Sequence, residues 1–139
     1  YTRTYDTDGK ITAELTERDA DYDGTLDYTR AVTYTFDTDG NETEKYIVRD
    51  DNGDGIVDVN TVTMSTYNDD GLITLRLVET EYLSGDYYSH NHATIYTYNP
   101  LGGLIAITTE DDDNGDGVID SIDEALLTLI PCSGDGTTP

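Results

Sequence analysis

The sequence predicts an all-β protein, an antiparallel meander built from 31-residue units of two strands each and joined by acidic loops. Three observations predict it: a repeat of fixed period, an abundance of residues that favour strands, and a turn signal between successive strands. Tyr, Val, Ile and Thr are frequent, and these residues fit the pleated surface of a sheet. Only 35% of the 139 residues are hydrophobic, so we do not expect a large aliphatic core.

An aromatic-Asx-x-x-Gly segment recurs every 31 residues, and its copies begin at Tyr5, Phe36, Tyr67 and Tyr98. Four copies on one period without an insertion indicate an internal repeat. A single domain spanning 1–130 and a polar tail or linker at 131–139 are therefore expected. The units of the domain are residues 5–35, 36–66, 67–97 and 98–128, with 1–4 as the end of a preceding unit.

These segments are expected to be hairpin turns. An Asx side chain at the first position can bond the backbone of its own turn, and Gly takes a positive φ angle at low cost. The four aromatic residues fall at equivalent places, where they could form a row across the strands. We interpret them as packing residues rather than as a surface for stacking a ligand.

The stretch 26–36 shows the clearest strand pattern. Val32, Tyr34 and their alternate neighbours share one face, and threonines such as Thr33 and Thr35 share the other, which is a period of two. The stretch 121–130 is open to two interpretations. Acidic residues near its start favour the first turn of a helix, whereas the repeat register predicts a strand.

The second connection of each unit is an acidic loop, and three good copies begin at Asp19, Asp50 and Asp112. Calcium takes six to eight oxygens, which such a loop supplies from side chains at positions one, three, five and nine and from a carbonyl at position seven, while Gly at six permits the bend. A merely solvated acidic turn would not explain this spacing three times. The predicted ligands of about three calcium ions are Asp19, Asp21, Asp23, Thr25 and Asp27; Asp50, Asn52, Asp54, Ile56 and Asp58; and Asp112, Asn114, Asp116, Val118, Asp120 and Asp123, the residues at position seven acting through their carbonyls. At the remaining copy, 81–89, the alternating carboxylates are lost, and no ion is expected.

The charge balance favours the binding of cations and argues against nucleic acids and anionic membranes as partners. Thirty acidic residues against seven basic ones give a net charge of −23. Nucleic acids and anionic membrane surfaces would be repelled, and no apolar stretch of about eighteen residues is available for membrane insertion. A chain this acidic folds more readily when cations neutralise it.

Catalysis is not expected, because no Ser-His-Asp spacing, phosphate-binding Gly loop or nucleophile elbow is present. Apolar material for a pocket that would raise the pKa of a carboxyl group is scarce. His90 and His92 fall two apart and could chelate a transition metal, but we expect them to be solvated or hydrogen-bonded. Cys132 stands alone, so it forms no disulfide within one chain.

The acidic loops resemble the Asp-x-Asp-x-Asp-Gly-x-x-Asp signature of thrombospondin type-three repeats and of dockerin or EF-hand loops. The turns that begin at Tyr5 and its copies resemble the YD repeats of bacterial Rhs proteins, which implies a long β-sheet of repeated hairpins. The dockerin resemblance is strongest at 112–127 and implies cohesin-type binding as a minor alternative. A dockerin needs two loop–helix units, whereas the first two loops here run into Thr- and Val-rich strand sequences.

We therefore expect an extracellular or cell-surface structural protein, rigidified by calcium, that serves as a fibre subunit, surface stalk or adhesin segment. The alternative is a calcium-dependent carbohydrate-binding module that uses exposed Tyr side chains. The chain opens on Tyr1 without Met or a signal-like segment, which suggests a processed piece of a longer protein. Unpaired strand edges at both ends predict self-association into a fibre or array.

Overall fold

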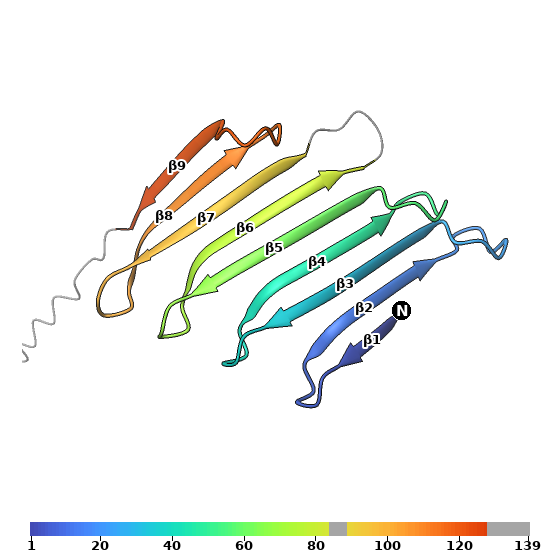
Figure 1. Cartoon of the computed structure of the whole chain (residues 1–139), viewed down its shortest axis with the longest axis horizontal. Helices are drawn as coiled ribbons and strands as arrows, with labels where there is room; N and C mark the ends of the chain where they lie inside the picture. The colour runs from blue at the N-terminus through green and yellow to red at the C-terminus, as the bar shows by residue number, and fades with distance from the viewer. Residues whose placement is uncertain (84–88, 128–139) are drawn as a thin grey trace, which may run out of the picture.

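A computed structural model describes residues 1–83 and 89–127. These residues form one open antiparallel sheet of nine strands in chain order, which confirms the predicted all-β meander (Figure 1). The described residues contain no helix long and apolar enough to cross a membrane. The strands are β1 (Thr2–Tyr5), β2 (Ile11–Arg18), β3 (Tyr28–Phe36), β4 (Glu42–Asp50), β5 (Val59–Tyr67), β6 (Ile73–Tyr82), β7 (His90–Tyr98), β8 (Leu104–Asp112) and β9 (Ser121–Leu126).

The last strand answers the question that the sequence left open at 121–130. Residues Ser121–Leu126 form β9, which pairs with β8 along its whole length. The strand predicted by the repeat register therefore forms, and the acidic residues at its start do not begin a helix. Cys132 and the expected tail 131–139 lie outside the described residues.

The four short turns share one hydrogen-bond pattern, as the Asx-x-x-Gly segments predict. In the first turn, Oδ1 of Asp6 accepts hydrogen bonds from the backbone N–H groups of Asp8 (2.9 Å) and Lys10 (2.8 Å). The equivalent side chains accept the same pair of bonds in the other turns; they are Asp37, Asn68 and Asn99. Each turn thus closes with its own side chain, and a register shift follows it in the adjoining strand pair.

The strand register divides the side chains between two faces of the sheet. One row runs Glu14, Val32, Ile47, Thr61 and Thr80 across β2 to β6, and we call the surface that contains it the Val32 face. The row on the opposite surface, which we call the Tyr46 face, consists of Thr33, Tyr46, Val62, Glu79 and Asn91.

The interior of this sheet is very small. Among the described residues, the only buried hydrophobic side chains are Val32, Val59 and Ala106, at 1%, 6% and 8% exposure. No other described element covers either face, because every strand belongs to the one sheet (Figure 1). Protein domains ordinarily bury a sheet against a second layer, so backbone pairing, turn closure and loop structure support this fold to an unusual degree.

The four repeated aromatic residues lie on alternate strands, β1, β3, β5 and β7, as the period predicts. An intervening strand separates each from the next by about 9–10 Å, too far for direct ring contact. Two of the rings have partners of another kind: the Tyr67 hydroxyl donates to the Glu42 carbonyl at 2.8 Å, and Lys10 Nζ lies 5.1 Å from the centre of the Phe36 ring.

Candidate metal centre

Three acidic loops are described, and all lie at the same end of the sheet (Figure 1). Loop 1 (19–27) joins β2 to β3, loop 2 (50–58) joins β4 to β5, and loop 3 (112–120) joins β8 to β9. The degenerate copy between β6 and β7 includes residues 84–88, which lie outside the described part of the chain. The absence of an ion there stays a prediction.

The side chains at positions one and nine hold the three loops in the same way. At position one, a carboxylate oxygen of Asp19, Asp50 and Asp112 accepts the N–H of the Gly at position six, at 3.0, 2.8 and 2.9 Å. At position nine, Asp27, Asp58 and Asp120 accept the N–H of the residue at position two, at 2.6, 2.7 and 2.9 Å. The spacing that the sequence singled out therefore corresponds to one repeated loop conformation.

Positions three and five continue the pattern through the middle of the loop. The side-chain oxygens at position three accept the N–H of position five; these residues are Asp21, Asn52 and Asn114. The side chains at position five accept the N–H of position seven, and the three donors are Thr25, Ile56 and Val118. All four predicted side-chain positions thus fold toward their own loop backbone in each copy.

Loop 1 brings three carboxylates together. Oxygen atoms of Asp19, Asp21 and Asp27 lie within 4.8 Å of one another, so this cluster could hold a metal ion. Oδ1 of Asp19 is buried and has no hydrogen-bond partner. Because a buried acceptor without a donor is costly, the loop fits a cation. Calcium agrees with the donor set, which consists only of hard oxygen ligands.

The equivalent Oδ1 oxygens of loops 2 and 3 have donors of their own. Oδ1 of Asp50 accepts the N–H of Gly53 at 2.6 Å, and Oδ1 of Asp112 accepts the N–H of Gly115 at 2.7 Å. Asp112 is only 2% exposed. Burial alone would raise the pKa of its carboxyl group, but hydrogen bonds from the backbone of Gly117, Gly115 and Asp116 outweigh burial and hold that pKa below its ordinary value.

Two predicted ligands, Asp23 and Asp123, have surroundings that differ from those of the other predicted ligands. Asp23 Oδ1 accepts hydrogen bonds from both the hydroxyl and the N–H of Thr25, which lower the pKa of the Asp23 carboxyl group. Asp123 lies on β9 opposite Thr109, three residues along β8 from Asp112, which corresponds to about 10 Å. The structure therefore does not bring Asp123 into loop 3 with the other predicted ligands.

The sequence interpretation overlooked position four of the loops. The backbone there has a positive φ angle in all three copies: 62° at Tyr22, 73° at Gly53 and 69° at Gly115. In loops 2 and 3 the neighbouring loop packs against this position, at Leu26 and Ser89 respectively. Tyr22 has a side chain that is 90% exposed. The signal was present as a second Gly in two of the three loops.

The two histidines lie on the Val32 face and have partners there. His92 Nδ1 lies 2.5 Å from Asp111 Oδ1, and His92 Nε2 lies 3.1 Å from Thr94 Oγ1. The ring of His90 lies beside that of Tyr82, with 6.1 Å between their centres. The expectation of a hydrogen-bonded histidine is confirmed for His92.

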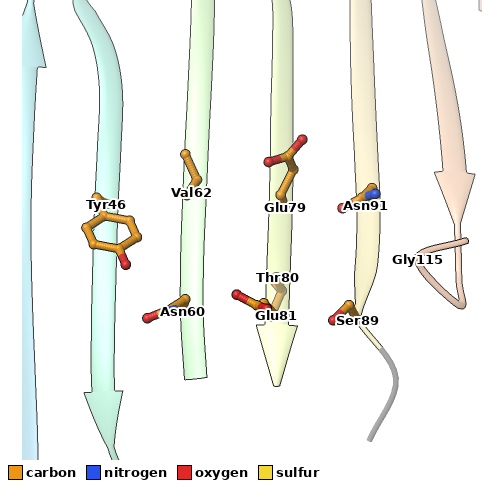
Figure 2. A pocket seen from close by; sticks show the side chains of 9 residues that line it. All are labelled: Tyr46, Asn60, Val62, Glu79, Thr80, Glu81, Ser89, Asn91 and Gly115. Atoms are coloured by element: carbon orange, nitrogen blue, oxygen red, sulfur yellow. The ribbon is translucent and has the colours of Figure 1, made fainter. Parts of the chain in front are cut away.

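A groove of about 490 Å³ crosses the Tyr46 face from β4 to β7 (Figure 2). The ring of Tyr46 lies at one side of it, and the carboxylates of Glu79 and Glu81 project into it. Its other lining residues are Asn60, Val62, Thr80, Ser89, Asn91 and Gly115. The exposed side chains that line the groove are rich in hydrogen-bond acceptors.

No protein-family model matches the chain, and no curated protein and no solved structure matches it either.

Proposed function

We propose that this chain is a calcium-stabilised structural repeat protein of the extracellular space or cell surface. The single observation that carries the proposal is loop 1, where Asp19, Asp21 and Asp27 converge and Oδ1 of Asp19 is buried without a donor. The shared backbone pattern extends the proposal to loops 2 and 3. Extracellular calcium modules typically bind in the range of about 0.1–1 mM, which suits that location.

Calcium would act as a structural element at one end of the sheet. Each loop crowds several carboxylates into a nine-residue connection, and their mutual repulsion opposes the hairpin unless a cation is present. An ion that binds only the folded loop stabilises the fold by mass action. A sheet with so small an interior depends on such support.

The edges of the sheet favour a fibre or array. Within the described residues β1 and β9 each pair with one strand only, and every residue of both strands is exposed. Unpaired edges are templates for further strands. Joining β9 of one copy to β1 of the next would continue the meander without closing a ring, which produces a filament.

Calcium titration tests the metal part of the proposal. Native mass spectrometry and calorimetry should detect ions bound to the wild type at millimolar calcium. An Asp19→Asn variant should lose one ion, whereas the matched change Asp8→Asn in a short turn should lose none. Failure of the wild type to bind calcium at millimolar concentration would refute calcium stabilisation.

The edge proposal has its own test at Glu124. Leu127 N–H donates to the Ile105 carbonyl at 2.8 Å, and bonded residues alternate along an antiparallel pair, so the N–H of Glu124 points away from β8. Glu124→Pro should therefore block pairing at this edge without removing a hydrogen bond of the sheet. Electron microscopy in calcium should show filaments for the wild type and none for Glu124→Pro; filaments of equal length from both would refute edge pairing.

Carbohydrate binding is a second candidate function, favoured by the groove on the Tyr46 face. A tyrosine ring beside amide and carboxylate acceptors can stack on a sugar ring and accept its hydroxyl protons. Titration with a panel of neutral oligosaccharides should show binding that Tyr46→Ala abolishes. An unchanged signal for that variant would exclude the groove as the site.

A further inference from the structure

The basic side chains of the protein are confined to one face of the sheet. The chain has seven Lys and Arg residues, and the strand register places the six that lie on strands on the Val32 face. Lys10, in a turn, extends over the Phe36 ring on that same face. The six strand residues are Arg3, Arg18, Arg30, Lys45, Arg49 and Arg76.

The Tyr46 face carries the complementary charge. It has no Lys or Arg, and outside the acidic loops the register places six carboxylates on it, against four on the Val32 face. Those on the Tyr46 face are Glu17, Glu44, Glu79, Glu81, Glu110 and Glu124. Those on the Val32 face are Glu14, Glu42, Asp111 and Asp123. The sheet is therefore electrically two-sided, although the chain as a whole is acidic.

Most of the basic groups have no carboxylate partner within the described chain. Ion pairs among the described residues engage Arg3 and Arg49 but not Arg30 or Lys45. Arg30 lies directly opposite Arg49 on the neighbouring strand, and like charges in that relationship destabilise a sheet. This arrangement suits a carboxylate surface supplied by another molecule.

The groove on the Tyr46 face has the chemistry to receive such a basic side chain. Oδ1 of Asn60 is buried there without a hydrogen-bond partner, and the exposed carboxylates of Glu79 and Glu81 only accept hydrogen bonds. A guanidinium supplies several donors and also stacks on an aromatic ring such as Tyr46. Donor-rich side chains of this kind occur on the opposite face of the same protein.

We propose that the Val32 face of one copy stacks on the Tyr46 face of a second copy, with an arginine such as Arg30 entering the groove. Like faces would place cations on cations or carboxylates on carboxylates, so only unlike faces are complementary. Sheets stack about 10 Å apart. Eight strand spacings of about 4.8 Å and strands about 27 Å long give a face of about 1,000 Å², which exceeds the roughly 800 Å² per partner of a standard interface.

This contact supplies the second layer that the isolated sheet lacks. Because the two partners use different faces, each copy keeps one face free, and the contact can propagate as a stack. The inference goes beyond the proposed function, since the side chains that carry it, Arg30, Glu79 and Glu81, belong to neither the acidic loops nor the edge strands. Stacking would join copies face to face, at right angles to edge pairing.

A charge-swap experiment tests the stacking directly. One variant, R30E with K45E, makes the Val32 face acidic; the other, E79K with E81K, makes the Tyr46 face basic. Both sets of changes lie on exposed or half-buried strand positions, and R30E also creates an opposite-charge pair with Arg49. A control, D8K with D39K, changes the charge by the same amount as the second variant but only in the short turns.

Analytical ultracentrifugation should be run in millimolar calcium and about 0.15 M salt, where the Debye length of about 8 Å screens the long-range repulsion of the acidic chain. We expect the mean mass of the wild type and of the control to rise with concentration above the 15.3 kDa monomer. Each double variant alone should stay monomeric. An equimolar mixture of the two should associate again, because each then meets a face of opposite charge.

Circular dichroism melting of each variant checks that a variant that stays monomeric is still folded. Renewed association in the mixture also shows that both variants are folded. All samples also carry Glu124→Pro, which blocks edge pairing, so any association that is measured comes from stacking. A failure of edge pairing therefore cannot be mistaken for a failure of stacking. Stacking is overturned if the wild-type faces give a monomer up to millimolar protein, or if either charge-reversed variant alone associates as strongly as the control.

Discussion

Gly53 lies directly against the main-chain carbonyl of Leu26 in the preceding acidic loop, so that a Cβ on Gly53 would fall 1.7 Å from the Leu26 oxygen. Successive loops on the same end of the sheet therefore touch through their backbones. Gly115 stands in the same relationship to Ser89, where a Cβ would fall 2.8 Å from the carbonyl oxygen. Loops 2 and 3 therefore each pack against the chain segment that precedes the neighbouring strand.

Replacing Gly53 should consequently cost more than replacing a nearby glycine of similar φ. Gly55 has a φ of 84° and nothing within 4 Å of its Cβ position, so Gly55→Ala should cost about 1–2 kcal/mol through backbone strain alone. Gly53→Ala adds a collision with the backbone and should cost clearly more. Urea unfolding of both variants measures the difference, and equal losses would show that the loops do not pack tightly.

Features that recur with the 31-residue period could be predicted from the sequence, whereas contacts that join different units could not. The turns at Asp6 and its copies, the strand order and the loop positions all recur with the period, so one unit explains the others. The contact of Gly53 with Leu26 joins two units, and the second Gly of the loop is its only mark in the sequence. The segregation of charge requires the register of every hairpin, including the shift after each short turn, and composition alone showed only a net charge of −23.

Asp123 shows the opposite error, in which a local pattern was extended too far. It occupies the twelfth position after Asp112, where an EF-hand loop would supply a ligand from a helix. Here the chain leaves the loop as the extended strand β9, which carries Asp123 away from Asp112 at about 3.3 Å per residue. The nine-residue part of the loop can keep its conformation in different folds. The place of a ligand at position twelve, such as Asp123, depends on whether a helix or a strand follows the loop.

Asp112 should stabilise loop 3 even without calcium. Its carboxylate accepts the N–H groups of Gly115, Asp116 and Gly117 while it is almost fully buried. Asp112→Ala leaves these donors without their acceptor, and the melting temperature in excess chelator should fall by several degrees. The neighbouring Asp113 is exposed, so Asp113→Ala provides the control and should melt like the wild type.

Acid should destabilise the protein partly through Glu14. Hydrogen bonds from Tyr1, Arg3 and Tyr34 lower the pKa of Glu14 from 4.5 to about 2. Because the folded pKa is the lower one, the stabilising contribution is complete above about pH 4.5 and disappears as the pH falls toward 2. The melting temperature of Glu14→Gln should fall less steeply than that of the wild type in this interval. Parallel curves for the two proteins would contradict the assignment, and Tyr34→Phe should give an intermediate slope.

The three loops should differ in calcium affinity because they differ in charge at position three. Loop 1 has Asp21 there, and loops 2 and 3 have Asn52 and Asn114. Since charge count tunes the affinity of such loops, Asp21→Asn should weaken binding to loop 1 on the order of tenfold, and Asn52→Asp should strengthen binding to loop 2 by a similar factor. Terbium luminescence sensitised by Tyr22, which lies in loop 1, reports on that loop, while calorimetry reports on all three. If both substitutions left every affinity unchanged, position three would not contact the ion, and the proposed ligand set would be wrong.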